Sequence, residues 1–203
     1  MFYETAKGHG LPHDPLKAIV APRPIGWIST QSRDGSVNLA PYSFFNAIST
    51  HPPLVFFSSE GHKDSPVFAE ETGAFVANLV GRDLAEKMNA TSIDAPRGTS
   101  EFELAGLTPA PSVLVSPPRV AEAAAALECR VTEVLRPKAL DGSQAGSIVV
   151  IGQVVGVHIA DEMLTDGLFD IVKAKTIGRL GYMDYASVDA VFSMRRPRWS
   201  AKK

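Results

Sequence analysis

A short run of charged and hydroxyl side chains, KDSP at residues 63–66, could bind an anion. Ser65 is placed to cap a helix, and the proline after it suits the first helical position, so we expect a helix over residues 66–72 that Gly73 ends. A helix start presents unpaired backbone N–H groups and the positive end of a dipole, and Lys63 adds a full charge. The run therefore predicts a phosphate site, although a plain helix start would have the same sequence.

A second group of polar side chains follows the end of a predicted strand. Small hydroxyl and amide residues are mixed there with aromatic ones, in the order Pro41, Tyr42, Ser43, Phe44, Phe45, Asn46, Ser49 and Thr50. Such a surface suits a flat ligand that is partly polar and partly aromatic. The alternative is an ordinary hairpin whose aromatic residues pack into the core.

The motifs that mark other chemistries are absent from the sequence. There is no GxGxxG or Walker phosphate loop and no GxSxG nucleophile motif. The five histidines show no paired spacing with carboxylates, which argues against a metal site. Cys129 is the only cysteine and lies in a predicted strand, where a buried and unreactive thiol is expected. We therefore assign neither a catalytic side chain nor a metal ligand.

A predicted β-hairpin positions the aromatic and polar group. Residues 25–32 and 37–44 both show the period-two pattern of a strand, and Arg33-Asp34-Gly35-Ser36 between them is a turn sequence. A buried strand is expected next at residues 54–57, and another at residues 74–80. The anion-binding run lies between these last two strands.

Two pairs of residues have the spacing of a capping box: Asp83 with Glu86, and Ser100 with Glu103. Each pair predicts a short helix directly after it. The proline-rich segment that follows excludes a regular helix and leaves at most a short edge strand at residues 113–115.

The two longest predicted strands are residues 125–136 and 147–159. The first alternates apolar and polar residues, which indicates one wet face, whereas the second is apolar on both faces. The second face of that strand should therefore meet a barrel interior or another subunit. Six or more strands with short helices and no βαβ alternation predict a mainly β protein (α+β), folded as a barrel or a strongly bent sheet.

The length of 203 residues suits one sizeable core, so we expect a single domain over residues 1–203. Residues 1–21 show no clear period and are expected to form an arm over the body or a partner subunit, or else a mobile terminus. Residues 190–203 are expected to form a C-terminal tail.

The formal net charge of −2 provides no long-range field for nucleic acid or an anionic membrane. The longest uncharged run, residues 142–160, is interrupted by polar side chains, which argues against a membrane span. The first residues lack the features of a signal peptide, so the cytoplasm is the expected compartment.

Several long blocks, in order along nearly the whole chain, resemble the flavin reductase-like family of FMN-binding split barrels, in the branch that includes flavoredoxin. The blocks are PRPIGWIST, DGSVNLAPYSFFNAIS, PPLVFFS, KDSPVFAEETGAFVANLV, EFELAGLTPAPS, LEC and KTIGRLGYMDY. The resemblance implies a split β-barrel of antiparallel, Greek-key-like strands that binds FMN, usually as a homodimer. It also implies NADH or NADPH as the electron donor, with the cofactor carrying the chemistry.

The resemblance also implies a set of cofactor-binding residues. The phosphate would lie near Lys63 and Ser65, and Arg179 and Tyr182 would come from a segment that folds over the pocket, often from the partner subunit. The ring and ribityl chain would meet Arg23, Trp27, Ser29, Thr30, Ala40, Pro41, Ser43, Phe45, Asn46 and Ala47. Trp27 could equally be a core residue, whereas Arg23, between two prolines, should be held rather than free.

Three functions follow from the resemblance. The first is an NAD(P)H:flavin oxidoreductase that supplies reduced flavin, for example to a monooxygenase. The second is a flavoredoxin-type electron carrier whose FMN is reduced by a protein partner. The third is a flavin-binding sensory module without turnover.

Overall fold

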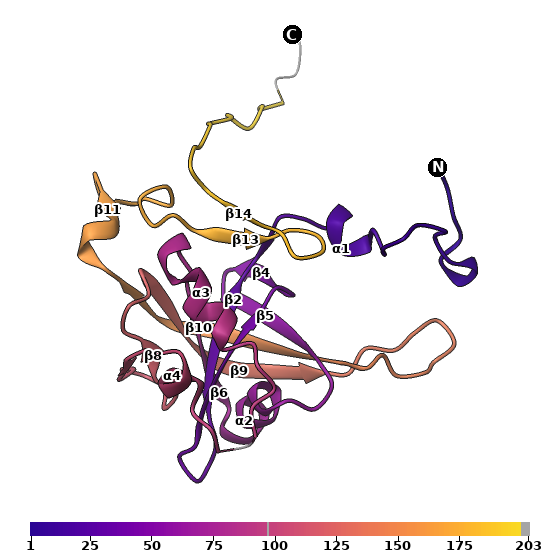
Figure 1. Ribbon diagram of the computed structural model, residues 1–203. Coiled ribbons are helices and arrows are strands. Elements are labelled where there is room, and N and C mark those ends of the chain that lie inside the picture. Colours follow the sequence, from indigo (N-terminus) through magenta and orange to yellow (C-terminus); the bar gives the residue numbers. More distant parts are fainter. Residues whose placement is uncertain (97, 200–203) are drawn as a thin grey trace.

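In the computed structural model, which describes residues 1–96 and 98–199, the body of the protein is one strongly bent antiparallel sheet (Figure 1). Its seven strands lie in the order β3-β2-β6-β9-β10-β5-β4. Their bounds are β2 Gly26–Gln31, β3 Val37–Tyr42, β4 Phe45–Thr50, β5 Pro53–Glu60, β6 Ala74–Asn78, β9 Ala125–Leu135 and β10 Ser147–Ile159. The mainly β fold with short helices predicted from the sequence is confirmed.

The barrel formed by this sheet is split between β3 and β4. These strands follow each other in the chain, with only Ser43 and Phe44 between them, yet they occupy opposite ends of the strand order. The turn therefore opens the barrel at this point instead of forming a hairpin. The expected split barrel is confirmed, and the open seam leaves the edge of β3 unpaired by the other described strands.

The predicted first hairpin is present, since β2 pairs with β3 from Gly26↔Tyr42 to Gln31↔Val37. The sequence analysis missed β4, because it predicted no strand between residues 44 and 54. This strand pairs with β5 and lies at the edge of the sheet, where most of its residues are exposed. An edge strand that contributes little to the core does not need the apolar alternation from which strands are predicted.

Side chains on the two faces of the sheet enter two separate cores. Ile28 belongs to the cluster inside the barrel with Phe57 and Phe75, whereas the neighbouring Trp27 belongs to a second cluster with Phe102. The helix α2, Asp64–Thr72, contributes Ala69 to the inner cluster. The short helices α3, Ala85–Ala90, and α4, Glu101–Leu104, contribute Met88 and Phe102 to the outer one.

The helix starts differ from the predicted caps. Ser65 lies inside α2, whose N-cap is Lys63, and no side chain caps the helix by a hydrogen bond. The Ser65 hydroxyl is used elsewhere, because it donates to Asn38. A 3-10 turn, η2 Arg82–Leu84, precedes α3, and the capping box predicted from Asp83 and Glu86 is wrong. Ser100 is the N-cap residue of α4 as predicted, but its side chain makes no capping hydrogen bond. Gly73 ends α2 in the left-handed conformation as expected.

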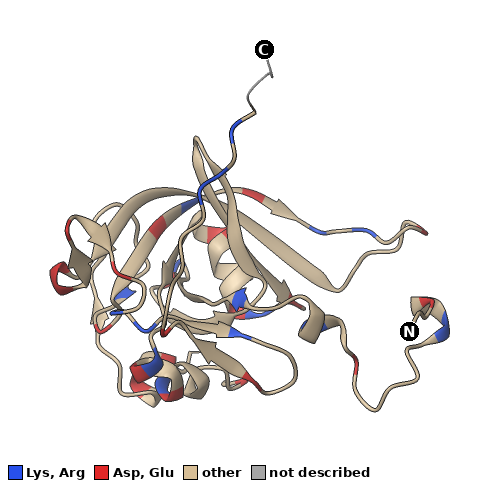
Figure 2. Cartoon of the chain, turned by 90° about the horizontal axis from the view of Figure 1, so that it is seen from above, with Lys and Arg blue, Asp and Glu red and all other residues tan. Residues whose placement is uncertain are grey.

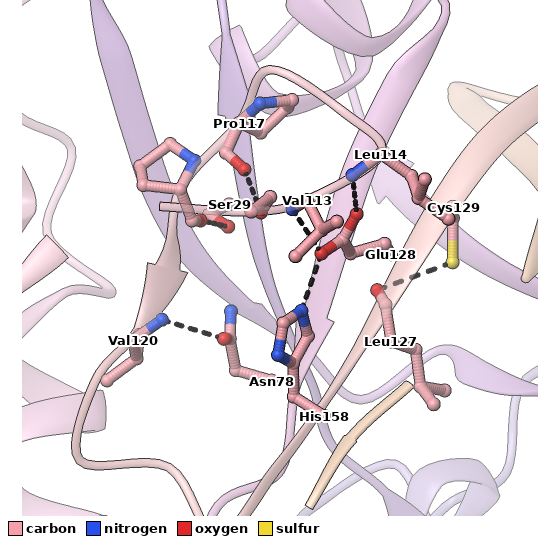
Figure 3. Close-up of polar contacts among 12 residues, drawn as sticks. Ser29, Asn78, Val113, Leu114, Pro117, Val120, Leu127, Glu128, Cys129 and His158 are labelled. Atoms are coloured by element: carbon pink, nitrogen blue, oxygen red, sulfur yellow. Dashed lines mark hydrogen bonds and ion pairs between the residues drawn. The ribbon is translucent and has the colours of Figure 1, made fainter. Parts of the chain in front are cut away.

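The predicted edge strand at residues 113–115 is not present. The ribbon instead forms β7, Pro109–Ala110, paired with β8, Arg119–Val120, and the chain between them is a loop. Figure 3 shows how this loop is fixed to the barrel. Pro118 O accepts a hydrogen bond from the Ser29 hydroxyl, and Val120 N donates to Asn78 Oδ1 at 2.8 Å. The prolines remove backbone donors, so side chains of the barrel hold the loop.

Glu128, a buried carboxylate on β9, holds the middle of the same loop (Figure 3). It accepts hydrogen bonds from Val113 N at 2.7 Å and Leu114 N at 2.6 Å, and it contacts His158 Nε2 at 2.5 Å. Burial alone would raise the pKa of Glu128, but the hydrogen bonds from His158 and the two backbone amides outweigh it, so the pKa is lowered. The ionised carboxylate is thus a fixed anchor for the loop.

The two chain ends meet at a small second sheet, in which β1, Arg23–Pro24, pairs with β13, Ile177–Arg179, and β13 pairs with β14, Tyr185–Ser187. Before β1, the N-terminal arm carries η1, Thr5–Lys7, and α1, Leu16–Ile19. Between β10 and β13 lie η3, Asp161–Met163, and the paired strands β11, Leu164–Thr165, and β12, Leu168–Phe169. Both ends of the chain extend away from the body (Figure 1).

Within the described residues, none of the helices has the length and apolar character needed to cross a bilayer. The longest helix of the body, α2, has nine residues.

Replacing Glu128 with glutamine should lower the free energy of unfolding by about 1–3 kcal/mol at pH 7, because the amide NH₂ group cannot accept the backbone N–H that the second carboxylate oxygen accepts. The loss should shrink as the pH falls below 4.5, the ordinary value of this carboxyl, because a lowered folded-state pKa stabilises the protein only while the group is ionised. Urea unfolding at several pH values measures both effects.

Glu133, exposed on the same strand, provides the control. Its glutamine variant should change stability by less than about 0.5 kcal/mol at any of these pH values. An equal loss for Glu128→Gln at pH 7 and at pH 3 would contradict the role of the ionised carboxylate.

Candidate functional site

A cleft with two connected lobes runs beside the unpaired edge of β3 and the start of α2. Pro41, Tyr42, Lys63 and Ser92 line both lobes. The helix lobe has a volume of about 450 Å³ and is also lined by Asn38, Ala40, His62, Asp64, Ser65, Thr91, Ile93, Asp94, Ala95 and Glu101. The arm lobe has a volume of about 460 Å³ and is also lined by Lys17, Arg23, Ile25, Ser43, Phe44, Ser58, Ser59, Glu60, Met88, Asn89, Arg179, Leu180, Tyr182, Met183 and Tyr185. Each lobe has the size of a small-molecule site.

A buried polar network forms one wall of the helix lobe. The Ser65 hydroxyl donates to Asn38 Oδ1 at 2.5 Å, and Asn38 Nδ2 donates to Glu101 Oε1 at 3.2 Å. Glu101 Oε2 accepts a further hydrogen bond from Leu39 N at 3.0 Å. The network joins β3, α2 and α4, so it fixes the start of α2 against the edge strand.

Burial raises the pKa of Glu101, although the hydrogen bonds from Leu39 N and Asn38 act in the opposite direction. A raised pKa means that the Glu101 carboxylate takes up a proton more readily than an exposed carboxylate does. Lys63 at the N-cap of α2 is half-exposed and pairs with the surface residue Asp94 at 3.3 Å. Its ammonium group is therefore close enough to the lobe to meet an anion.

Two buried hydroxyl groups lie at the junction of the lobes without a hydrogen-bond partner among the described residues. Tyr42 is 9% exposed and Ser59 is 1% exposed, and neither Tyr42 Oη nor Ser59 Oγ is satisfied. The pKa of Tyr42 is raised, chiefly by burial, while hydrogen bonding with the Ser65 and Ser59 hydroxyls opposes the shift. These hydroxyls therefore lie near Tyr42 Oη, although neither makes a hydrogen bond of good geometry with it. Buried polar atoms are almost always paired in folded proteins, so these two hydroxyls have hydrogen-bonding capacity that a ligand in the cleft could use.

Arg23 forms a bracket between the N-terminal arm and the rest of the arm lobe. Arg23 is 7% exposed, and its guanidinium donates to the carbonyl oxygens of Lys17, Val20 and Leu180, the last at 2.9 Å. A longer contact of 3.4 Å joins its Nε to Ser43 Oγ. The expectation that Arg23 is held is correct, but backbone carbonyls of the protein hold it, so most of its donors are already used.

Arg179 lies beside Arg23, as their paired positions in β13 and β1 require. Its guanidinium carbon is 4.5 Å from the centre of the Tyr185 ring, and its Nη2 donates to Tyr182 O at 2.5 Å. Tyr182 has a φ of 55°, an uncommon conformation for a residue with a bulky side chain, and its ring is half-exposed. The strained turn between β13 and β14 thus presents a phenol and a guanidinium to the cleft.

The structure brings together part of the predicted site. The cleft is lined by Arg23, Ala40, Pro41, Ser43, Lys63, Ser65, Arg179 and Tyr182, which come from distant parts of the sequence. It is not lined by Trp27, Ser29, Thr30, Phe45, Asn46 or Ala47.

The predicted site residues that do not line the cleft lie in the core or on the edge strand β4. Trp27 is fully buried in the outer core and donates from its indole to Thr91 Oγ1 at 2.9 Å, so the core interpretation of this residue is correct. Ser29 and Thr30 are also fully buried on β2. Phe45 packs its ring over Gly26, while Asn46 and Ala47 are exposed on the edge strand β4.

Sequence reasoning missed Asn38, Ser59, Glu101 and Lys17. Asn38 could have been found, because it lies on the same face of β3 as Ala40 and Tyr42. Lys17 could not, since the arm has no periodicity that predicts where it folds. Ser59 and Glu101 become site residues only through the pairing of distant elements.

No group of three potential metal-ligating side chains occurs in residues 1–96 and 98–199. Burial raises the pKa of the Cys129 thiol to about 12, with Glu128 adding to the shift. Cys129 is fully buried in the inner core, as expected for an unreactive thiol.

Comparison with known proteins identifies relatives over most of the chain. A family model described as a flavin reductase like domain matches residues 20–178. A relative from Halalkalibacterium halodurans is 37% identical over 193 residues, which cover 93% of this chain and 92% of the relative.

Solved structures share the fold described above. Nitrilotriacetate monooxygenase component B from Bacillus cereus superimposes with a TM-score of 0.83 at 32% identity, over 88% of this chain and 90% of that one. Flavoredoxin of Desulfovibrio vulgaris (Miyazaki F) superimposes with a TM-score of 0.77 at 22% identity, over 86% of this chain and 91% of that one. Taken with the match over residues 20–178, these comparisons show that the chain belongs to the flavin reductase-like family.

Proposed function

We propose that the two-lobed cleft binds FMN and that the protein is an NAD(P)H:flavin oxidoreductase. The observation that carries this proposal is the pair of unsatisfied hydroxyls, Tyr42 Oη and Ser59 Oγ, at the junction between an anion-compatible lobe and an aromatic lobe. A ligand with a charged tail and a polar-edged ring would use all three features. Membership of the flavin reductase-like family supports a flavin as that ligand.

The helix lobe suits the phosphate of FMN. The first turn of α2 supplies backbone N–H groups without intrahelical partners, and Lys63 supplies a positive charge. The Ser65 hydroxyl already donates to Asn38, so the role of Ser65 is to fix the start of the helix through the buried network. Both Glu101 carboxylate oxygens already accept hydrogen bonds, from Asn38 Nδ2 and Leu39 N, so part of the negative charge in this wall is compensated within the protein.

Bound FMN would supply the redox chemistry by accepting a hydride from a dihydronicotinamide. The chain then has to bind and orient the two partners and limit the access of water to them. Tyr42 and Ser59 would orient the flavin by hydrogen bonds, and Phe44 and Tyr185 offer partly exposed aromatic faces in the adjacent lobe. We assign no side chain as a general acid or base.

A homodimer and an oxygenase or redox protein as a further partner belong to the same proposal. The apolar strand β10 has one face turned outward, where Val157 and Ile159 line an apolar groove of about 230 Å³ together with Phe45 and Phe169. A second copy would cover this surface. The name of the B. cereus protein, a component of a monooxygenase, supports delivery of reduced flavin to such an enzyme.

Removing the two junction hydroxyls separates their role in ligand binding from any role in folding. Tyr42→Phe and Ser59→Ala should leave the ligand-free protein equally stable or more stable by up to about 1 kcal/mol, because each removes an unsatisfied buried oxygen. The same variants should weaken FMN binding by roughly 2- to 12-fold each, which is the value of one net hydrogen bond. Thermal unfolding and quenching of FMN fluorescence measure the two quantities.

Thr176→Val is the matched control, because Thr176 Oγ1 is also buried and unsatisfied but lies outside the cleft. This variant should gain stability without any change in FMN affinity. Loss of stability without loss of FMN affinity in Tyr42→Phe would count against the proposed site.

The phosphate contact is tested by comparing FMN with riboflavin, which lacks the phosphate. Lys63→Ala should weaken FMN binding by roughly tenfold, as expected for a partly exposed charge-assisted contact, and should leave riboflavin binding unchanged. Lys138→Ala, in an exposed loop away from the cleft, should change neither affinity. Equal losses for FMN and riboflavin would remove the phosphate from the helix lobe.

The activity itself is tested by anaerobic stopped-flow mixing of the FMN-loaded protein with NADH or NADPH. The flavin absorbance near 450 nm should bleach within about a second at millimolar donor, in keeping with typical turnover of about 10 per second. Bleaching only by a reduced ferredoxin-like protein would favour an electron carrier. Resistance to every reductant would favour a sensory module.

A further inference from the structure

The arm lobe gathers positive charge without a balancing carboxylate partner. Lys17, Arg23 and Arg179 all line it, and none of the three forms an ion pair with a carboxylate within residues 1–96 and 98–199. Glu60 is the one acidic residue of its described lining. Elsewhere acidic and basic residues are scattered over the ribbon (Figure 2), so this cluster is a local feature of a chain whose net charge is −2.

The cluster is built into the small second sheet. Arg23 and Arg179 are directly opposite each other in the antiparallel pairing of β1 with β13. Like charges at such positions destabilise a sheet. Burial lowers the pKa of Arg23, and the nearby Arg179 lowers it further. An anion between the strands and the arm would relieve this repulsion.

Lys17 and Arg179 have N–H donors available for such an anion. Arg23 is committed to backbone carbonyls, whereas Arg179 gives one nitrogen to Tyr182 O and rests its guanidinium on the Tyr185 ring. Lys17 Nζ lies 5.8 Å from the centre of the Phe44 ring and has an exposed side chain. The arm lobe thus presents the planar guanidinium of Arg179 and the ammonium group of Lys17, which come from two different elements.

We propose that Lys17 and Arg179 form a clamp for the diphosphate of a nicotinamide dinucleotide that binds in the arm lobe. The inference rests on the proposed function, because it needs the flavin in the adjacent part of the cleft. A diphosphate can engage two cations on separate elements at once. The exposed rings of Phe44 and Tyr182 offer stacking surfaces for the adenine base, which leaves the nicotinamide free to face the flavin.

The position of Lys17 depends on the packing of the arm. The Arg23 bracket fixes the carbonyl of Lys17 itself, and Ala18 packs against the turn that follows Arg179. A Cβ atom on Gly181 would lie 2.4 Å from Ala18 Cβ, so the glycine is required for α1 to approach this closely. Gly181→Ala should therefore displace Lys17 without removing any charge from the lobe.

Equilibrium binding of NAD⁺ to the FMN-loaded protein, measured by calorimetry, tests the clamp without turnover. Lys17→Gln and Arg179→Gln should each weaken binding by about tenfold, and Gly181→Ala should weaken it in the same direction. Lys7→Gln, which removes an exposed cation from the same arm, is the control and should bind normally. Raising the salt concentration should weaken NAD⁺ binding to the parent protein more than NAD⁺ binding to the two charge variants.

A second readout separates the clamp from the flavin site. The reduction rate should be measured with NADH and with 1-benzyl-1,4-dihydronicotinamide, which has the same reactive ring but no phosphate. Lys17→Gln and Arg179→Gln should lose at least fivefold more rate with NADH than with the uncharged donor. Normal NAD⁺ binding in both charge variants, or equal losses with the two donors, would overturn the clamp.

Failure of the proposed function would be seen before these measurements. If the parent protein takes up no FMN, the flavin proposal itself is wrong and the clamp falls with it. If it takes up FMN and the charge variants bind NAD⁺ as the parent does, only the clamp is wrong.

Discussion

The whole site depends on one unmade pairing, that between β3 and β4. In a closed barrel these two strands would hydrogen-bond to each other and the sheet would have no free edge. Here the chain leaves β3 at Tyr42 and begins β4 at Phe45 on the opposite end of the strand order. The edge of β3 therefore remains available, and the cleft follows it from Asn38 to Ser43. The start of α2 lies along this edge, and α4 is joined to it by the hydrogen bonds of Glu101.

Buried polar side chains hold the elements around the cleft in place, and most of them have a hydrogen-bond partner. Glu128 holds the proline-rich loop by two backbone amides, and the network of Ser65, Asn38 and Glu101 ties α2 to the edge strand. Tyr42 and Ser59 are the exceptions at the cleft, since their hydroxyls are buried and unsatisfied. This difference separates the polar groups that stabilise the fold from the two hydroxyls to which we assign the flavin.

The sequence predicted the fold well where residues alternate between a core and another environment. The hairpin at residues 25–44 and the strand β9 follow from such alternation, β10 follows from a continuous apolar run, and all are present. The prediction failed where contacts between distant segments determine the local structure. The polar residues of β4 show no apolar period, because that strand lies at the sheet edge, and Ser65 was taken as a cap although Asn38 receives its hydroxyl hydrogen bond. The cleft residues Lys63 and Ser65 were recognisable by type, whereas Lys17 and Ser59 reach the cleft only through folding.

The bracket made by Arg23 has a practical meaning for anyone who edits the ends of this chain. Two of the carbonyls that accept its hydrogen bonds belong to Lys17 and Val20, so residues 17–20 are part of the rim of the cleft. Trimming them would leave a buried guanidinium short of acceptors and would expose the lobe to solvent. Purification tags are accordingly better placed after the C-terminal tail, which leaves the body from β14.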